Sequence, residues 1–201
     1  LQFPFKTMIQ RRHVGLAFGI IALLSLVFVP LPSQGQNAPF IAIWDTENTG
    51  LSNDDQIIIP GEGTDYLIEW EELGNAENNG SETGTDEHTV TFPNPGVYRV
   101  EISGDFTRIN FGLYGFNNPG DENKIVLVTQ WGDIQWSTMH EAFEDTKNLE
   151  IGASDTPDLS SVTDMSSMFR GSGVTGSNSQ IGQWDVSGVT NMRRMFEDVA
   201  A

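Results

Sequence analysis

A hydrophobic pattern that occurs three times organises the C-terminal part of the chain. Each copy begins with polar residues that suit a helix start and continues with apolar residues at positions i, i+3 and i+4. The copies are residues 136–143, 162–169 and 189–196, and their final phenylalanines are 26 and 27 positions apart. The apolar positions are Met139, Ala142 and Phe143, then Met165, Met168 and Phe169, and then Met192, Met195 and Phe196. A fixed period of this length predicts stacked repeats.

Each copy predicts a helix of about two turns, which is too short to persist alone in water. Its apolar face must therefore pack against neighbouring copies. A short segment before each helix predicts one strand of a parallel sheet, and it contains Leu159 in the second copy and Trp184 and Asp185 in the third. Gly, Ser, Asn and Asp fill the rest of each period, which is typical of turns.

The segment 181–196, with the sequence IGQWDVSGVTNMRRMF, resembles the repeat of BspA-type leucine-rich-repeat bacterial surface proteins, also described as the 26-residue bacterial surface repeat. The first copy departs from the pattern at Trp136 and Ala142, as expected of a terminal repeat that caps a stack. The resemblance implies a short leucine-rich-repeat-type α/β solenoid over residues 125–201. It also implies a secreted or cell-surface interaction protein that is not an enzyme. Because the sequence stops just after a predicted helix, we expect the array to be truncated.

Short segments rich in β-branched and aromatic residues predict a small antiparallel β-sandwich over residues 37–118. Residues 97–102 alternate apolar and polar side chains, as a half-buried strand does. Residues 119–124 are the predicted linker, and residues 125–128 predict a strand that opens the repeats. The predicted strands of the sandwich are residues 40–44, 56–59, 66–70, 89–92, 97–102 and 108–111.

Residues 92–100, with the sequence FPNPGVYRV, resemble a corner of PKD-type immunoglobulin-like domains. Pro95 and Gly96 suit the tight turn of that corner, since proline fixes φ and glycine allows positive φ. The W-G-D-G sequence of those domains is absent, because Glu71 follows Trp70. The resemblance implies an Ig/PKD-like sandwich, and the predicted fold class is therefore α+β and multidomain.

Residues 1–36 predict a secretory signal. Arg11 and Arg12 precede an apolar run over residues 14–29, and small residues around Gly35 follow it. Met8 is then the expected initiator, with residues 1–7 an overextended start. The alternative is an uncleaved anchor helix, but this run is short for a full membrane span. We therefore expect a secreted or bacterial cell-surface protein that meets the membrane only through this segment during export.

Charge excludes one class of partner. The chain has 28 acidic and 10 basic residues, a net charge of −18. Lys6, Arg11 and Arg12 all lie in the predicted signal, so its removal leaves a net charge of −21. Phosphate would be repelled, and nucleic acid is therefore not an expected partner. The absence of cysteine rules out disulfides and zinc–thiolate sites.

The sequence offers no catalytic constellation and implies no cofactor. His13 lies in the signal, His88 beside a loop and His140 on the predicted outer side of a repeat, so each is interpreted as a surface residue and not as the partnered imidazole that a catalytic site needs. Residues 71–87 form an acidic, glycine-rich segment, interpreted as a solvated loop. The alternative of a calcium loop lacks the characteristic ligand spacing.

Two classes of function remain open. The first is adhesion or protein–protein interaction through the repeats, with an unknown protein or surface glycan as partner. The second is a secreted carbohydrate-binding module in which Trp70, Trp131, Trp136 and Trp184 form a sugar-stacking platform. The equivalent repeat positions of Trp131 and Trp184 favour packing over such a platform.

Overall fold

The structure, a computed structural model, describes residues 38–113, 120–175 and 180–199. Within these ranges the chain forms ten strands and two 3₁₀ helices, and it contains no α-helix. The strands are β1 (Phe40–Asp45), β2 (Gln56–Ile59), β3 (Gly61–Gly63), β4 (Tyr66–Glu72), β5 (Asn75–Gly84), β6 (His88–Thr91), β7 (Val97–Ser103), β8 (Phe106–Ile109), β9 (Ile125–Gln130) and β10 (Glu150–Ile151). The 3₁₀ helices are η1 (Phe111–Leu113) and η2 (Gln180–Gln183).

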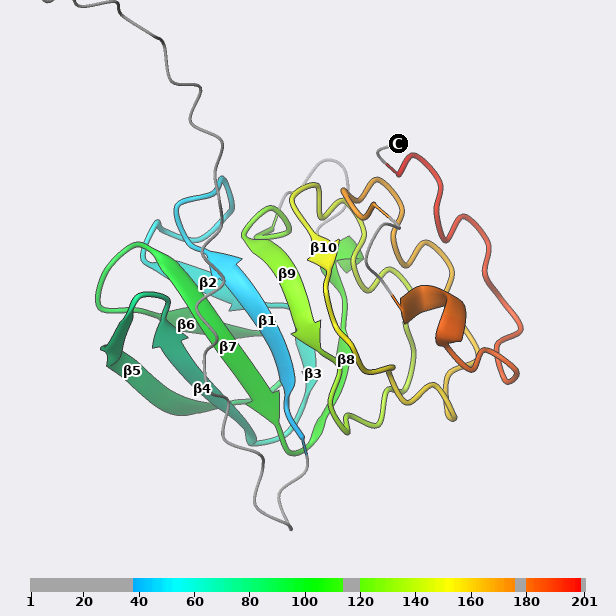
Figure 1. Ribbon diagram of the computed structural model, residues 1–201, viewed down its shortest axis with the longest axis horizontal. Coiled ribbons are helices and arrows are strands. Elements are labelled where there is room, and N and C mark those ends of the chain that lie inside the picture. The colour runs from blue at the N-terminus through cyan, green and yellow to red at the C-terminus, as the bar shows by residue number, and fades with distance from the viewer. Residues whose placement is uncertain (1–37, 114–119, 176–179, 200–201) are drawn as a thin grey trace, which may run out of the picture. The chain divides into compact units, whose positions relative to one another are not determined.

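Six strands form one mixed sheet in the order β10-β9-β1-β7-β4-β5 (Figure 1). All neighbours are antiparallel except β10, which pairs in parallel with β9. Strand β7 shows why the sequence forms this sheet. Its residues Tyr98, Val100 and Ile102 are buried, and the residues between them are partly exposed. This period of two directs one face of the strand to the core.

Two short antiparallel sheets, β2-β6 and β3-β8, complete the β-structure. Aromatic rings join them to the large sheet. Tyr66 of β4 meets Phe106 of β8 with ring centroids 4.9 Å apart, and Trp70 of β4 meets Phe92, which follows β6, at 5.2 Å. Both contacts are edge-to-face, the arrangement that the aromatic quadrupole favours.

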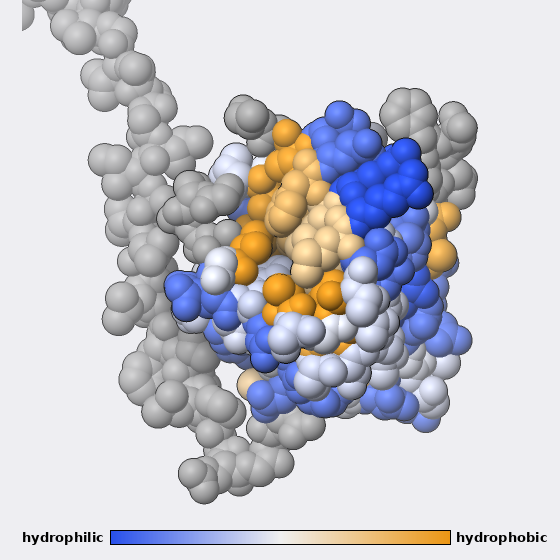
Figure 2. All heavy atoms as spheres, turned by 90° about the vertical axis from the view of Figure 1, so that its right-hand side faces the viewer, coloured by the Kyte–Doolittle hydropathy of each residue, from blue (hydrophilic) through white to orange (hydrophobic). Residues whose placement is uncertain are grey.

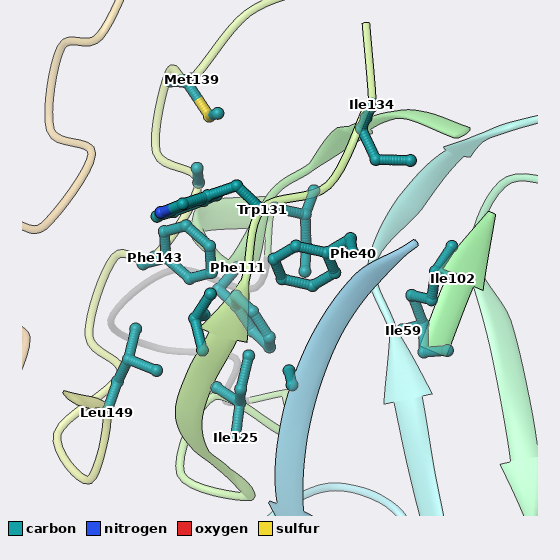
Figure 3. Packing of buried hydrophobic residues seen from close by; sticks show 14 of the residues in the cluster. Phe40, Ile59, Ile102, Phe111, Ile125, Trp131, Ile134, Met139, Phe143 and Leu149 are labelled. Carbon is teal, nitrogen blue, oxygen red and sulfur yellow. The ribbon is translucent and has the colours of Figure 1, made fainter. Parts of the chain in front are cut away.

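One hydrophobic core fills the space between the sheets and continues into the repeats. Figure 3 shows Phe40 of β1 beside Trp131, with ring centroids 6.0 Å apart. Trp131 in turn contacts Phe143 of the first repeat copy at 5.9 Å. Phe111 of η1 also contacts Phe143, and all four rings are buried. The predicted sandwich residues and the predicted repeat residues therefore share one core.

The structure confirms the positions of the predicted strands but not a purely antiparallel sheet. Segments 40–44, 56–59, 66–70, 89–92, 97–102 and 108–111 overlap β1, β2, β4, β6, β7 and β8, and segment 125–128 lies in β9. The interpretation of residues 71–87 as a loop is wrong, because β5 pairs along most of β4 in this range. Gly80 and Gly84 lie opposite Trp70 and Tyr66, and a Cβ at either glycine would collide with the facing ring. Glycine therefore makes room for the aromatic side chains of β4.

The prediction of an α/β leucine-rich-repeat solenoid is wrong, and so is the α+β fold class. None of the three copies is helical in the part of the chain that the structure describes. Each copy instead forms two consecutive turns. In the second copy, Met168 N–H donates to Met165 O at 3.3 Å, and Arg170 N–H donates to Ser167 O at 3.1 Å. The first and third copies have the same pair of turn hydrogen bonds.

Positive backbone angles explain why these turns are not helices. Glu141, Ser167 and Arg194 occupy the same place in the three copies and have φ of 56°, 56° and 59°. A right-handed helix excludes this conformation, whereas it is required at the third residue of a type II turn. The turns still place the apolar residues at i, i+3 and i+4 of each copy, such as Met165, Met168 and Phe169, on the same side of the chain. The i, i+3, i+4 pattern therefore has a second structural solution.

Of the parallel strands predicted before the repeat helices, only Asp158 forms a bridge, which is isolated and pairs in parallel with Gln135. Residues 184–186 form no strand or bridge. The other isolated parallel bridge, between Asp164 and Asn191, lies within the second and third copies. No helix in the described ranges is long and apolar enough to span a bilayer. The predicted signal over residues 1–36 lies outside the described residues.

Candidate interaction face

The three copies stack through a ladder of backbone hydrogen bonds. Alternate N–H groups of one copy donate to carbonyl oxygens of the next, at N–O distances of 2.8–3.0 Å. The ladder comprises Met139 to Asp164, Glu141 to Ser166, Phe143 to Met168 and Asp145 to Arg170, and then Met165 to Asn191, Ser167 to Arg193, Phe169 to Met195 and Gly171 to Glu197. Packed helices would lie about 8–10 Å apart, so these contacts require the closer approach of paired extended chains.

A stack of aromatic rings runs beside this ladder. The rings of Phe143 and Phe169 lie 5.8 Å apart at an interplanar angle of 12°, and those of Phe169 and Phe196 lie 5.7 Å apart at 16°. Phe169 is therefore covered on both sides and is 0% exposed, whereas Phe196 is 51% exposed. The structure confirms that Phe169 is more buried than Phe196, although turns and not helices bring the rings together.

The third residue of each copy, which is Thr138, Asp164 or Asn191, caps a turn. Asp164 Oδ1 accepts hydrogen bonds from the Ser166 N–H at 2.8 Å and the Ser166 hydroxyl at 2.6 Å. Its Oδ2 accepts one from the Asn191 side chain at 3.0 Å, which links the second copy to the third. Burial alone would raise the pKa of Asp164, but these hydrogen bonds outweigh it and lower the pKa below its usual value of 3.8. The charged carboxylate is thus the form that stabilises the stack.

Replacing Asp164 by Asn is expected to reduce the loss of stability in acid. Because the folded state lowers the pKa of this carboxyl, its contribution is complete above the unfolded pKa and is lost as the pH falls through the folded value. Denaturant melts at about pH 6 and about pH 3 measure the difference. Asn191 makes the equivalent cap to the Arg193 N–H at 3.2 Å, so the fold should accept the change. Equal acid losses in both proteins would contradict this role.

The β-strands cover the first copy on the side away from the second. Phe111 N–H donates to Ala142 O at 3.4 Å, and Gly112 N–H donates to Glu141 O at 3.3 Å. Ser137 N–H donates to Thr107 O at 2.9 Å. Residues from β8 and η1 thus occupy the place that a preceding repeat would take.

The third copy has no such cover among the described residues. The side chains of Met192 and Phe196 in this copy are 42% and 51% exposed, and that of Val186, just before it, is 38% exposed. Figure 2 shows that apolar residues gather on this side of the molecule, next to strongly hydrophilic ones. No described acceptor bonds to the N–H groups of Met192, Arg194, Phe196 and Asp198, which are equivalent to the ladder donors of the second copy. We call these three side chains and four N–H groups the open face.

The predicted repeat positions divide into a buried set and an exposed set. Trp184 and Met195 are nearly buried, at 7% exposed each. Asp185 is exposed, and its carboxylate accepts a hydrogen bond from the Ser187 N–H at 3.0 Å. Of the predicted repeat positions, only Met192 and Phe196 contribute side chains to the open face; its third side chain, Val186, was not among those positions. Met139, Phe143, Met165, Met168 and Phe169 are all fully buried.

Sequence reasoning missed the polar part of the open face. Arg193 and Arg194 are exposed beside Met192 and Phe196 in a strongly acidic chain. Arg194 has an ion pair with Glu197 at 3.5 Å, with both side chains nearly half exposed. Such an exposed pair contributes little to stability. The sequence does contain a signal for this feature, because Arg193 and Arg194 are the only two adjacent basic residues after residue 36.

The sugar-stacking platform has no exposed rings to support it. Trp131 and Trp136 are 0% exposed, and Trp131 meets Trp184 edge-to-face at 5.2 Å. Trp70 is partly buried between Phe92 and Tyr98. Stacking on a sugar requires an accessible ring face, so these residues act in packing.

One group of side chains has the composition of a hydrolase triad but not its bonding. His140 Nδ1 lies 2.9 Å from Ser166 Oγ, and His140 Nε2 lies 3.4 Å from Glu141 Oε1. The Ser166 hydroxyl, however, donates its proton to Asp164, and its residue is buried. The histidine therefore has no hydroxyl proton to accept. No cluster of three metal-ligating side chains occurs in the described ranges.

Comparison with known families gives one match. The sequence model of the family described as "Mycoplasma protein of unknown function, DUF285" matches residues 130–201. This range begins at the end of β9 and contains all three copies. The similarity thus concerns the stacked repeats and leaves strands β1 to β8 unmatched. No curated protein and no solved structure matches the chain.

Proposed function

We propose that this protein is a non-enzymatic, exported bacterial surface protein that mediates adhesion or protein–protein interaction through the open face. The observation that supports this is Phe196, whose ring stacks on Phe169 and which is 51% exposed. Two exposed arginines, Arg193 and Arg194, lie close to this aromatic residue in the sequence, and aromatic residues and arginine are both enriched in protein interfaces. The resemblance to BspA-type surface repeats and to PKD-like domains supports the same class of function.

Export accounts for the N-terminal sequence in this proposal. We expect residues 1–36 to be removed, so that N-terminal sequencing of the secreted protein begins near Gln36 or Asn37. A mature protein that retains residues 14–29 in the membrane would contradict the cleaved signal. The bead-attachment experiment below tests the interaction at the open face independently of the signal.

Beads coated with the mature protein test the interaction. We expect Phe196→Asp to reduce bead attachment to cultured cell layers by about tenfold or more, because central aromatic residues dominate interface energies. Leu73→Asp is the matched control, since Leu73 is 46% exposed in the turn between β4 and β5. Thermal melts must show that both variants are folded. Equal attachment by both variants, or no attachment by the native protein, would refute the proposal.

A further inference from the structure

The open face presents hydrogen-bond donors in one direction. In the four-bond ladder of each interface, the N–H groups point to the following copy and the accepting carbonyls point to the preceding one. Among the described residues, bonds in the reverse direction occur only beside the ladder, where Thr190 N–H and Asn191 N–H donate to Thr163 O, and Gly173 N–H donates to Thr146 O. The four ladder carbonyls of the third copy, those of Asn191, Arg193, Met195 and Glu197, already accept hydrogen bonds from the second copy. An ordinary sheet edge offers donors and acceptors alternately, whereas this one offers a row of donors.

A row of four donors at every second residue restricts the ligand. The two internal interfaces show what satisfies such a row, because in each of them four alternate peptide carbonyls accept the bonds at 2.8–3.0 Å. A small anion would satisfy one or two donors and leave the rest. An extended polypeptide presents carbonyls with this two-residue repeat along its whole length.

The side chains of the internal interfaces define the partner further. Each interface stacks one phenylalanine on the next, at 5.8 Å and 5.7 Å. Charges in neighbouring copies are opposite where they meet, since Arg170 of the second copy forms an ion pair with Glu144 of the first. A partner on the open face would meet Arg193, Arg194 and Glu197. Acidic or neutral residues are therefore favoured opposite the two arginines.

A second copy of this chain is not the partner that fits. The carbonyl row it would have to offer is that of its own first copy, and residues from β8 and η1 cover that side. Phe111 and Gly112 already donate to the carbonyls of Ala142 and Glu141. Head-to-tail association would require these contacts to break.

We propose that the open face binds an extended polypeptide segment as a fourth parallel row. The segment accepts hydrogen bonds from the four N–H groups, stacks an aromatic side chain on Phe196, and places acidic or neutral side chains opposite Arg193 and Arg194. This inference rests on the proposed interaction function and specifies the class of partner.

Two synthetic peptides of equal length test the mode of binding. One has the sequence of residues 158–172, which places serines opposite Arg193 and Arg194 and an arginine opposite Glu197. The other has the sequence of residues 185–199, with the same apolar pattern but like charges at all three positions. We expect the first to bind more tightly. Replacement of its phenylalanine by alanine should weaken it.

Residue-resolved amide exchange of the mature protein supplies the decisive readout. At a peptide concentration about ten times the dissociation constant, exchange of the four open-face amides should slow about tenfold. The amides of Arg193, Met195 and Glu197 already bond within the third copy and should change little. Phe196→Asp should abolish the effect. Met192→Asp serves the same purpose if the first variant is unfolded.

Alternating protection supports the inference. Peptide binding without alternation, equal affinity of the two peptides, or no binding at their solubility limit would overturn it. The bead experiment judges the proposed function separately. If the peptide tests fail but bead attachment still depends on Phe196, the open face binds a different kind of partner.

Discussion

Replacing Phe169 by alanine is expected to lower the free energy of unfolding by about 3–5 kcal/mol, the range for emptying a buried aromatic site. Phe169 is 0% exposed, and its ring contacts Phe143 on one side and Phe196 on the other. It also contacts Trp184, with ring centroids 6.3 Å apart. The loss therefore combines the transfer of the ring, two stacking contacts and a cavity between copies.

Phe196→Ala is the matched control for this result. Its ring is half exposed and stacks on one neighbour only, so the expected loss is about 1–2 kcal/mol. Denaturant unfolding of the two variants measures both values. A loss for Phe196→Ala that equals or exceeds the loss for Phe169→Ala would mean that the copies are not stacked in the observed order.

Lys124→Met is expected to be about as destabilising, at roughly 3–5 kcal/mol, because it removes a buried charge whose surroundings are built to accept it. Lys124 is 0% exposed, and its Nζ donates to the carbonyl oxygens of Ser52, Asn53 and Gln56 at 2.8–3.1 Å. Ser52 Oγ accepts a further bond from Nζ at 2.8 Å and donates to Asp121. The variant would remove one hydrogen-bond donor from each of these four acceptors.

Asp121 explains why the loss should be large. Its carboxylate is 0% exposed and accepts the N–H groups of Leu51, Ser52 and Ile58 at 2.7–3.0 Å. Burial lowers the pKa of Lys124, and the Asp121 charge opposes this shift. Without the lysine, the buried carboxylate would lose the favourable interaction with the Lys124 charge.

Lys147→Met is the control for the lysine variant, because Lys147 is exposed. Its expected effect is within about 0.5 kcal/mol. Equal effects of the two substitutions would show that the Lys124 ammonium is not held by the surrounding oxygens. No sequence pattern predicted this site, since the partners of Lys124 are some 70 residues away along the chain and most are backbone carbonyls.

Strands with an apolar face could be predicted from the sequence. Alternation placed β7 correctly, and the run of isoleucines in residues 56–59 matches β2. Strand β5 could not be predicted in this way, because its residues NAENNGSETG have hardly any apolar side chains. It exists because its backbone pairs with β4 and its glycines accommodate Trp70 and Tyr66.

The conformation of the repeats could not be read from their apolar spacing. Spacing of i, i+3 and i+4 fits a helix, but here it comes from two turns with a positive φ at Glu141, Ser167 and Arg194. None of these is glycine, so no residue type marked the turn. The period did predict which residues are equivalent. The open N–H groups depend on backbone direction, which side-chain patterns do not report.

The most direct test of the stacked ladder is amide exchange in the mature protein without any ligand. We expect the amides of Met165, Ser167, Phe169 and Gly171 to exchange slowly, because each donates to the third copy at 2.8–2.9 Å. The equivalent amides, those of Met192, Arg194, Phe196 and Asp198, should exchange fast, since no described residue accepts from them. Protection of consecutive amides in the third copy, as a helix gives, or equal exchange in both sets, would contradict the ladder and its open face.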